Sequence, residues 1–141
     1  MAYVHSRFGA DTLTGGNLAL PLTAAAHTLR TSAVRFATEL SPAAIGTVAA
    51  IIGLHLQAAY LWLNRNWADP FWRLGAAFCV LLVVLGPKVW EAPLAACRDV
   101  LPMTIAFNVL LFRRTSPAWQ LFAWGNAYSL YGLFKAFTYI S

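Results

Sequence analysis

Few residues in this chain could do chemistry, and their spacing does not assemble a catalytic set. The five acidic residues are scattered along the chain, at Asp11, Glu39, Asp69, Glu91 and Asp99. None recurs at a helical spacing that would put two carboxylates on one face for acid–base or two-metal work. The sequence has no Gly-rich phosphate loop, no His-x-x-x-His pair and no Ser-His-Asp set with a local signature. We therefore expect a protein that is not an enzyme.

His55 is the one histidine in the middle of a long apolar stretch. One interpretation is a neutral imidazole hydrogen-bonded to a neighbouring helix. The other is an axial ligand to haem iron or to the magnesium of a bacteriochlorophyll, because imidazole commonly ligates such metals. The segment "HLQAAYLWLNRNW" (55–67) resembles one helix of bacterial light-harvesting polypeptides, in which a membrane histidine precedes interfacial tryptophans. It departs from that pattern at Ile51, where those chains carry a small residue.

Composition indicates the elements that must position these residues. The 141 residues are 60% hydrophobic and 11% charged, with a mean hydropathy of +0.60, whereas charged residues make up about 25% of soluble domains. This predicts an all-α integral membrane protein without room for a separate soluble catalytic domain. The net charge of +5 indicates anchoring near anionic headgroups rather than binding to nucleic acid. Cys79 and Cys97 lack metal-ligand neighbours and are expected to pack as free thiols.

The first 43 residues are predicted to form a surface loop and then a basic amphipathic helix. The turn-rich stretch "DTLTGGNLALPL" (11–22) is typical of a loop, and a helical pattern begins at Thr23. Arg30 and Arg35 lie on the polar side of this helix and are expected at the membrane surface. A cap packed over the ends of the spans is the alternative. The apolar side consists of Leu22, Ala26, Leu29, Ala33, Phe36 and Leu40.

Residues 44–141 are predicted to form a membrane domain with four spans, at about 43–63, 72–89, 93–112 and 117–140. Ser41-Pro42 is a helix start signal for the first span. Gly86-Pro87 is expected to end or kink the second. The third reaches spanning length only if it begins near Pro93.

Small and polar residues mark helix-packing faces on three of these spans. On the third span, Thr104 and Asn108 share a face and are expected to hydrogen-bond to another helix. The candidate partners of Asn108 are Thr104, Gln57, Asn126 and a group on another subunit. The small-residue stripes are Gly46, Ala50, Gly53 and Gln57 on the first span, and Gly125, Ser129, Gly132 and Ala136 on the fourth.

Charged residues predict the depth and the orientation of the helices. Arg98 and Asp99 point in different directions on a helix, so each is expected to pair with a neighbour or the interface more readily than with the other. Asp99 is expected close to Arg98, Lys88 or a partner's cation. Arg113 and Arg114 are expected at headgroup level. Six basic residues on the side of the termini against four on the other favour cytoplasmic termini. The two groups are Arg7, Arg30, Arg35, Lys88, Arg98 and Lys135, and Arg65, Arg73, Arg113 and Arg114.

A second resemblance covers more of the chain. The stretches "GNLALPL" (16–22), "LGPKVWEAPLAACRDVLPMTIAFNVLL" (85–111) and "LFAWGN" (121–126) resemble the C-terminal membrane region of polytopic bacterial proteins of cell-surface glycopolymer formation, which are mannosyltransferase-like. Such transferases keep their catalytic acid in an N-terminal half that these residues do not match. The resemblance therefore implies a detached, non-catalytic membrane module.

The surplus of helix-packing faces predicts a non-catalytic accessory subunit that packs against larger partners in a bacterial-type inner membrane, with lipid as a further partner. A photosynthetic or respiratory assembly is the expected host, and contacts with lipid or bacteriochlorophyll are conceivable. The alternatives are the glycopolymer-related module and a small carrier or channel. A carrier would require a polar cavity, of which the sequence gives little sign.

Overall fold

The computed structural model describes residues 18, 20–39, 41–91, 94–114 and 118–140, so the predicted loop at 11–22 lies largely outside it. These residues are helical apart from turns and one isolated β-bridge between Leu18 and Leu85, which confirms the all-α class. The helices are α2 (Thr23–Glu39), α3 (Pro42–Leu63), α4 (Pro70–Val84), α5 (Pro87–Glu91), α6 (Ala95–Asp99), α7 (Leu101–Phe112), α8 (Trp119–Gly125) and α9 (Tyr128–Ile140).

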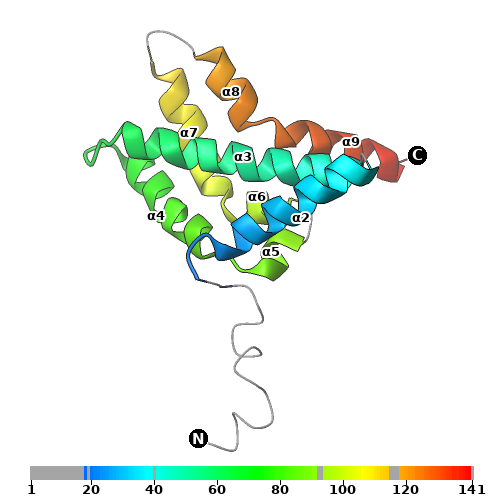
Figure 1. The fold of residues 1–141 in the computed structure, drawn as a ribbon. Coiled ribbons are helices and arrows are strands. Elements are labelled where there is room, and N and C mark those ends of the chain that lie inside the picture. The colour runs from blue at the N-terminus through cyan, green and yellow to red at the C-terminus, as the bar shows by residue number, and fades with distance from the viewer. Residues whose placement is uncertain (1–17, 19, 40, 92–93, 115–117, 141) are drawn as a thin grey trace, which may run out of the picture.

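Helix α3 runs across the centre of the molecule, with α2, α4, α7, α8 and α9 packed around it (Figure 1). Ser41 is its N-cap in extended conformation and Pro42 occupies the first turn, as the start signal predicted. The helix ends where the Asn64 side chain donates from Nδ2 to the carbonyl oxygen of Tyr60 at 2.8 Å. Its 22 residues correspond to about 33 Å. Among the described helices, it alone is long and apolar enough to cross a membrane.

The second predicted span is interrupted at Gly86-Pro87, where the sequence predicted an end or a kink, and the residues from Pro87 to 89 belong to a second, short helix. Helix α4 ends at Val84, and Leu85 is extended with ψ of 132°. Pro87 cannot donate a backbone hydrogen bond and restricts Gly86 to extended conformations, so a new short helix, α5, begins at Pro87. The backbone N–H of Leu22 donates to the carbonyl oxygen of Val83 at 2.8 Å. The segment before α2 therefore satisfies a backbone group at the end of α4.

The third and fourth predicted spans are also broken rather than continuous. Helix α6 ends at Asp99 and α7 begins at Leu101, because the ring of Pro102 would clash with a carbonyl of the preceding turn. Asn126 and Ala127 separate α8 from α9. The segment 93–112, predicted as one span, thus contains two helices, α6 and α7. The segment 117–140 likewise contains α8 and α9.

Large apolar side chains lie on the outside of the molecule as well as in its core. The core holds Leu54, Leu61, Met103 and Phe107, each at most 1% exposed. Large apolar side chains are nevertheless exposed on α3, α4, α7, α8 and α9, and they include Ile45, Ile52, Trp62, Leu74, Val80, Ile105, Phe112, Trp124, Leu130, Leu133, Phe134 and Phe137. On α9, Leu130, Leu133, Phe134 and Phe137 share one exposed face, and soluble monomers rarely expose large contiguous apolar patches.

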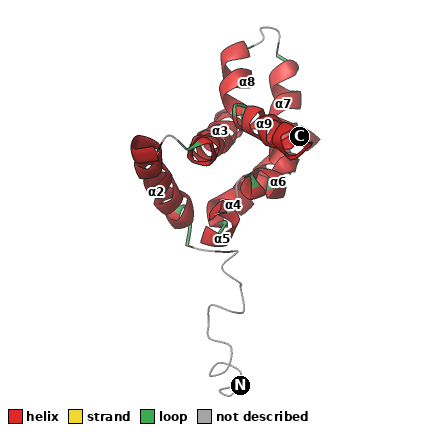
Figure 2. Ribbon diagram, turned by 90° about the vertical axis from the view of Figure 1, so that its right-hand side faces the viewer, coloured by secondary structure: helices red, strands yellow, loops and turns green. Residues whose placement is uncertain are grey.

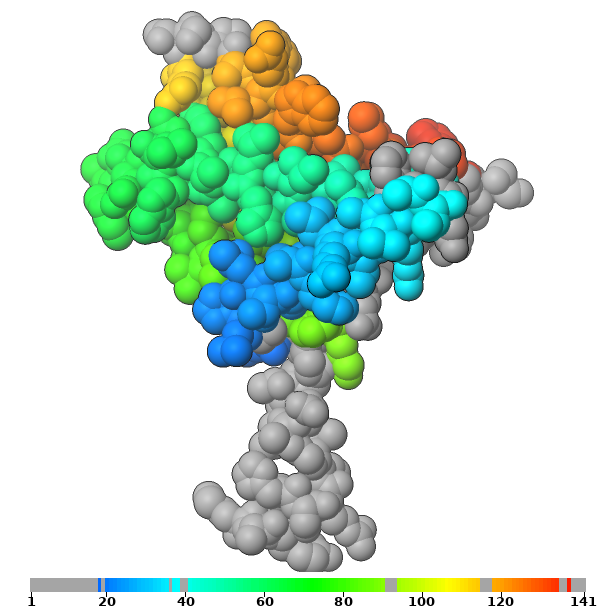
Figure 3. All heavy atoms as spheres, viewed as in Figure 1, coloured from blue at the N-terminus to red at the C-terminus, as the bar shows by residue number. Residues whose placement is uncertain are grey.

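Helix α2 packs against α3 and α5 through a narrow edge of small residues. Ala24, Ala25 and Ser32 are buried there. Of its predicted apolar side, Leu22, Ala26 and Leu29 are exposed, so that side does not pack into the fold. The side chains of Phe36 and Leu40 lie outside the described residues. The space-filling view shows α2, in blue, lying across the surface below α3 (Figure 3).

Candidate functional site

Three residues distant in the sequence form a buried hydrogen-bonded group beneath α3, here called the polar cluster: Gln57, Thr104 and Tyr128. The hydroxyl of Thr104 donates to Gln57 Oε1 at 2.9 Å and lies 2.9 Å from the hydroxyl of Tyr128. Gln57 Nε2 donates to the backbone carbonyl of Gly125 at 2.8 Å. Gln57 is fully buried. The Tyr128 hydroxyl can donate to the Thr104 hydroxyl, which itself donates to Gln57, so both hydroxyl hydrogens have an acceptor.

The polar cluster compensates the break between α8 and α9. The carbonyl groups in the last turn of a helix have no partner within that helix. The carbonyl of Gly125 ends α8 inside the fold, where water cannot reach it freely, and the Gln57 amide supplies the missing donor. A buried carbonyl without a donor would be costly, so this hydrogen bond stabilises the break.

A second polar pair joins the same break to α7. Asn108 Nδ2 donates to Asn126 Oδ1 at 3.2 Å, and Asn126 Nδ2 donates back to Asn108 Oδ1 at 3.0 Å. Asn126 Nδ2 also lies 2.9 Å from the carbonyl oxygen of Phe122, in the last turn of α8. Of the partners considered for Asn108 from the sequence, the structure selects Asn126.

The small residues of α3 lie against α8 and α9. The ring of Tyr131 covers Gly46 so closely that a Cβ would collide with it. A Cβ on Gly53 would lie 2.9 Å from the carbonyl oxygen of Gly125, and one on Gly125 would lie 2.9 Å from Cε1 of Phe107. Ala50 is buried on the same side of α3. The stripe on α3 and the first glycine of the fourth segment are therefore in direct contact.

The stripe predicted along the fourth segment does not continue into α9. Ser129 is exposed, because the chain changes direction between α8 and α9 and the register of one continuous helix is lost. Gly132 is half-buried, and a Cβ there would lie 3.3 Å from Cδ1 of Leu94. Gly132 thus faces the end of the flexible Leu94 side chain rather than the backbone of another helix.

Sequence reasoning missed two residues that hold the helices together. Gly75 lets α4 approach α3 and α7 closely, since a Cβ there would lie 2.8 Å from Cδ1 of Leu61 on α3 and 3.0 Å from Cβ of Ala106 on α7. Its signal was the small pair Gly75-Ala76 within an otherwise bulky apolar run. Tyr128 was missed as well, because a tyrosine in an aromatic segment carries no sign of a polar partner.

The C-terminal ends of α3 and α7 meet at one end of the molecule in a set of charge and aromatic contacts. Arg113 Nη1 lies 3.0 Å from Asp69 Oδ2, and its guanidinium covers the ring of Phe71 at 4.9 Å. Asp69 also caps α4 by accepting from the backbone N–H of Phe71 at 2.8 Å. Asp69-Pro70 repeats the start signal seen at Ser41-Pro42, which sequence analysis did not use for α4.

The neighbouring arginines at this end also bind through π faces. Arg114 donates to Asn64 Oδ1 and covers the ring of Tyr60 at 5.1 Å. Arg65 covers the ring of the exposed Trp62 at 4.4 Å. Cation–π contacts of this kind are attractive because the ring face is negative.

Arg98 and Asp99 pair with each other, contrary to expectation: Arg98 Nε lies 3.3 Å from Asp99 Oδ1. The expectation assumed a helix that continues through both residues. Because α6 ends at Asp99, the geometry of a continuing helix no longer separates the two side chains.

His55 is half-buried, and its hydrogen bond differs from the expected interhelical one. Nδ1 lies 2.7 Å from the carbonyl oxygen of Ile51 in its own helix. Since a carbonyl only accepts, Nδ1 carries the hydrogen, and Nε2 of the neutral ring remains an acceptor. The neighbouring contact is a ring stack with Trp90 on α5, at 6.4 Å and 25° between planes. This tautomer is the one that ligation through Nε2 requires, and ligation stays a prediction.

Figure 2 shows α2 on one side of the molecule, with α3 and α5 facing it. Residues of these three helices line a polar groove of about 880 Å³, although the sequence gave little sign of a polar cavity. Its lining residues are His27, Thr28, Thr31, Ser32, Arg35, Ser41, Ala43, Ala44, Thr47, Pro87 and Trp90. Arg30, on the same helix as Arg35, is exposed and does not line it. Both arginines are thus exposed, as residues at a membrane surface would be, but only Arg35 faces a hollow.

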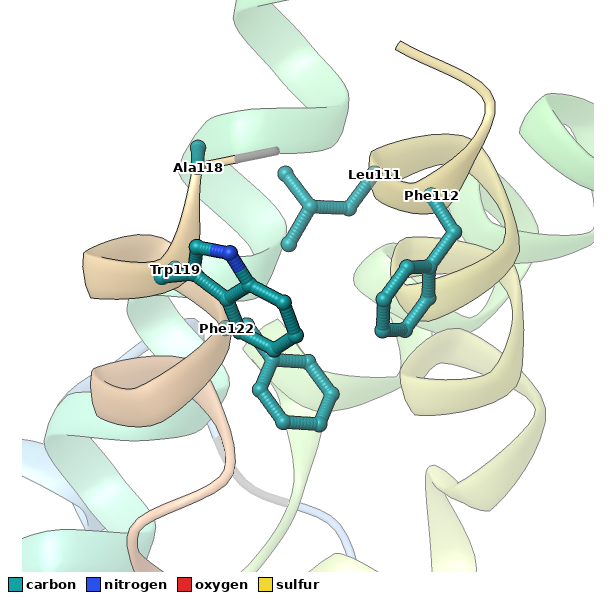
Figure 4. A pocket seen from close by; sticks show the side chains of 5 residues that line it. All are labelled: Leu111, Phe112, Ala118, Trp119 and Phe122. Carbon is teal, nitrogen blue, oxygen red and sulfur yellow. The ribbon is translucent and has the colours of Figure 1, made fainter. Parts of the chain in front are cut away.

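A much smaller crevice of about 10 Å³ lies between the end of α7 and the start of α8. Leu111 and Phe112 line it from α7, and Ala118, Trp119 and Phe122 from α8 (Figure 4). The rings of Phe112 and Phe122 lie 5.3 Å apart and fill most of the space. The crevice holds at most about one water molecule and offers no ligand site.

Cys79 and Cys97 are free thiols, half-buried and buried respectively. Within the described part of the chain, no three His, Cys, Asp or Glu side chains are grouped to hold a metal ion. Comparisons with protein-family models, with curated proteins and with solved structures gave no match to this chain. The resemblances to glycopolymer-forming and light-harvesting proteins therefore stay predictions.

Proposed function

We propose that this protein is a non-catalytic accessory subunit of an inner-membrane complex in a bacterial-type cell. The observation that carries the proposal is the exterior of α3, α4, α7, α8 and α9, where many large apolar side chains are exposed, while the few polar groups between these helices are paired within the fold. A soluble protein normally keeps most of its large apolar side chains inside. Lipid or partner helices would cover such an exterior.

Under this proposal the chain crosses the membrane four times, once through α3 and three times through interrupted segments. Helices α4 and α7 have only 15 and 12 residues, or about 22 and 18 Å, which is short of the roughly 30 Å hydrocarbon core. Each reaches membrane width only together with its neighbour, α5 or α6. The Gln57 amide and the N–H of Leu22 satisfy backbone carbonyls at two of the breaks.

The end formed by Asp69, Arg113 and Arg114 would lie at one headgroup layer. Exposed Trp62 and Trp67 accompany these charges, as aromatic residues do at membrane interfaces. The side of the membrane that holds the termini would carry six basic residues and the other side four, which favours cytoplasmic termini.

The face most suited to a partner is the outer side of α9. Leu130, Leu133, Phe134 and Phe137 are exposed there at i, i+3, i+4 and i+7, the spacing by which a helix inserts into a partner's groove. Photosynthetic and respiratory complexes are the host class we favour.

Purification of the tagged chain from its native membrane in a mild detergent tests the proposal. We expect a large complex to co-purify with the chain, and its absorption spectrum to report any haem or bacteriochlorophyll. Phe134→Ala with Phe137→Ala should lose the complex, whereas Leu74→Ala with Val80→Ala, on the exposed face of α4, should retain it. A chain that extracts from membranes alone, or that stays in the aqueous fraction after lysis, would refute the proposal.

A further inference from the structure

Four exposed arginines gather where α3 ends, α4 begins and α7 ends, and they are here called the arginine face: Arg65, Arg73, Arg113 and Arg114. Arg113 pairs with Asp69, the residue before α4. Arg114 donates to Asn64, the residue after α3. These contacts bring the three helix ends together. The turn between α3 and α4 lies on the side of the molecule opposite α9 (Figure 1).

The positive charge of the arginine face is largely unneutralised. Asp69 is the one acidic side chain in the sequence from 40 to 90, and there is none from 100 to 141. Four arginines against this carboxylate leave a net charge of +3. One oxygen of Asp69 pairs with Arg113, and the other caps α4. These two segments therefore offer no carboxylate to the other three arginines.

Three of the four guanidiniums lie over aromatic rings. Arg65, Arg113 and Arg114 cover Trp62, Phe71 and Tyr60 at 4.4, 4.9 and 5.1 Å. A ring attracts a cation but carries no net charge, so it holds the guanidinium in place without neutralising it. A guanidinium has five N–H donors, and within the described residues each of the four makes at most one side-chain hydrogen bond. The arginine face therefore presents positioned donors to acceptors from outside the chain.

Exposed tryptophans accompany the arginine face. Trp62 and Trp67 are 65% and 72% exposed, and the ring of Trp67 packs 4.6 Å from that of the buried Trp72. Trp119, at the start of α8, is exposed as well, and Figure 4 shows it beside the end of α7, where its ring lies 6.3 Å from that of Phe112. Indole rings of this kind occupy the headgroup level of membranes. The combination favours a lipid surface over an acidic protein.

We propose that the arginine face binds the headgroups of anionic phospholipids, with guanidinium N–H groups donating to their phosphate oxygens. A guanidinium suits phosphate because its paired N–H groups match two oxygens. A zwitterionic lipid carries the same phosphate together with an ammonium group, which a face of net positive charge repels. The inference deepens the proposed function and rests on it, since headgroups meet this end only if the helices lie in a membrane.

Lipid binding is measured on the full-length chain purified in maltoside detergent. The chain is titrated with dioleoyl phosphatidylglycerol and with dioleoyl phosphatidylcholine, which share acyl chains and phosphate but differ in net charge. Native mass spectrometry counts the lipid molecules bound at each concentration. We expect phosphatidylglycerol to bind at least about 25-fold more tightly, because each arginine near an anionic headgroup contributes about fivefold. Flotation with phosphatidylcholine vesicles after a carbonate wash reports membrane insertion separately.

Arg65→Gln with Arg73→Gln should lower the affinity for phosphatidylglycerol by about fivefold for each arginine and leave that for phosphatidylcholine unchanged. Both residues are exposed, and neither makes an ion pair within the described residues, so this variant should keep the fold. Arg30→Gln with Arg35→Gln is the matched control, because it removes two exposed arginines from α2, which has no tryptophan. Its affinity for phosphatidylglycerol should change less than about twofold.

Two results would overturn the inference while the chain still inserts into vesicles. Equal affinities for the two lipids would leave an acidic protein as the occupant of the arginine face. Equal losses in the two glutamine variants would assign the lipid preference to net charge rather than to this face. A chain that does not float with vesicles would refute the proposed function and this inference together.

Discussion

Gln57 donates its side-chain amide to the backbone carbonyl of Gly125 at 2.8 Å, across 68 positions of sequence. One bond thereby connects the middle of the longest described helix to the break between α8 and α9. The same amide accepts from Thr104 on α7 through its oxygen, so three helical segments meet at one buried side chain. The position of α8 and α9 relative to the rest of the fold depends on this group.

Replacement of Gln57 by Leu should destabilise the protein more than replacement of Thr104 by Val. The Leu variant leaves the Gly125 carbonyl without its donor and removes one of the two partners of the Thr104 hydroxyl, which we expect to cost about 2–3 kcal/mol in total. Thr104→Val breaks hydrogen bonds but leaves the Gly125 carbonyl satisfied, and should cost about 1 kcal/mol. Unfolding in mixed detergent micelles measures both values. Equal stability of the two variants would show that the Gly125 contact contributes nothing.

The Asn108–Asn126 pair should show coupling in a double-mutant cycle. Asn126→Leu should cost more than Asn108→Leu, because only Asn126 also donates to the Phe122 carbonyl. We expect a coupling free energy of about 1 kcal/mol, since each single variant leaves one amide unpaired and the double variant leaves none. Additive costs in the same unfolding assay would contradict a direct interaction between the two amides.

The contacts between helices were easier to predict from sequence than the course of the helices. Gly53 and Gln57 were assigned to a packing face because small residues and one amide at three- and four-residue steps have few other uses in an apolar helix. The structure brings that face against Gly125. The sequence could not specify which helix would approach, since that depends on contacts between residues far apart along the chain.

Hydropathy misled the prediction at the backbone breaks in the third and fourth segments, whereas Gly86-Pro87 was identified as the end or a kink of the second. Pro102 lies inside the predicted third span, and its effect was underestimated because the flanking residues are apolar enough to suggest one continuous helix. The break at Asn126 has no proline, and only the pair Gly125-Asn126 marks it. The groove was missed for a different reason: its polar residues belong to α2 and to the ends of α3 and α5, and no local pattern connects them.

Alanine substitutions at two glycines should separate a backbone contact from a side-chain contact. At Gly53 the new Cβ meets the carbonyl oxygen of Gly125, which cannot move without shifting the end of α8, and the cost should be about 2–3 kcal/mol. At Gly132 it meets only Cδ1 of Leu94, a side chain that can rotate, and the cost should stay below about 1 kcal/mol. Thermal unfolding in detergent compares the two. A Gly132 variant as unstable as the Gly53 variant would indicate that α9 approaches its neighbour more closely than described.

Asp69 has two distinct roles that variants can separate, because each of its oxygens has its own partner. Oδ1 accepts from the N–H of Phe71 and caps α4, while Oδ2 pairs with Arg113. Asp69→Ala loses both interactions and should cost about 1–2 kcal/mol, most of it from the cap. Asp69→Asn retains an oxygen for the cap, and Arg113→Gln retains the carboxylate. Each should therefore cost less than about 1 kcal/mol, as expected for an ion pair whose arginine is more than half exposed.

Salt concentration provides the control for this assignment. Salt screens an exposed ion pair but has little effect on a hydrogen bond between a capping side chain and a backbone N–H. The stability difference between wild type and Arg113→Gln should therefore shrink in 1 M NaCl, while the deficit of Asp69→Ala should largely persist. If the Asp69→Ala deficit disappears in high salt, the cap contributes little and the contact with Arg113 is what holds α4 and α7 together at this end of the molecule.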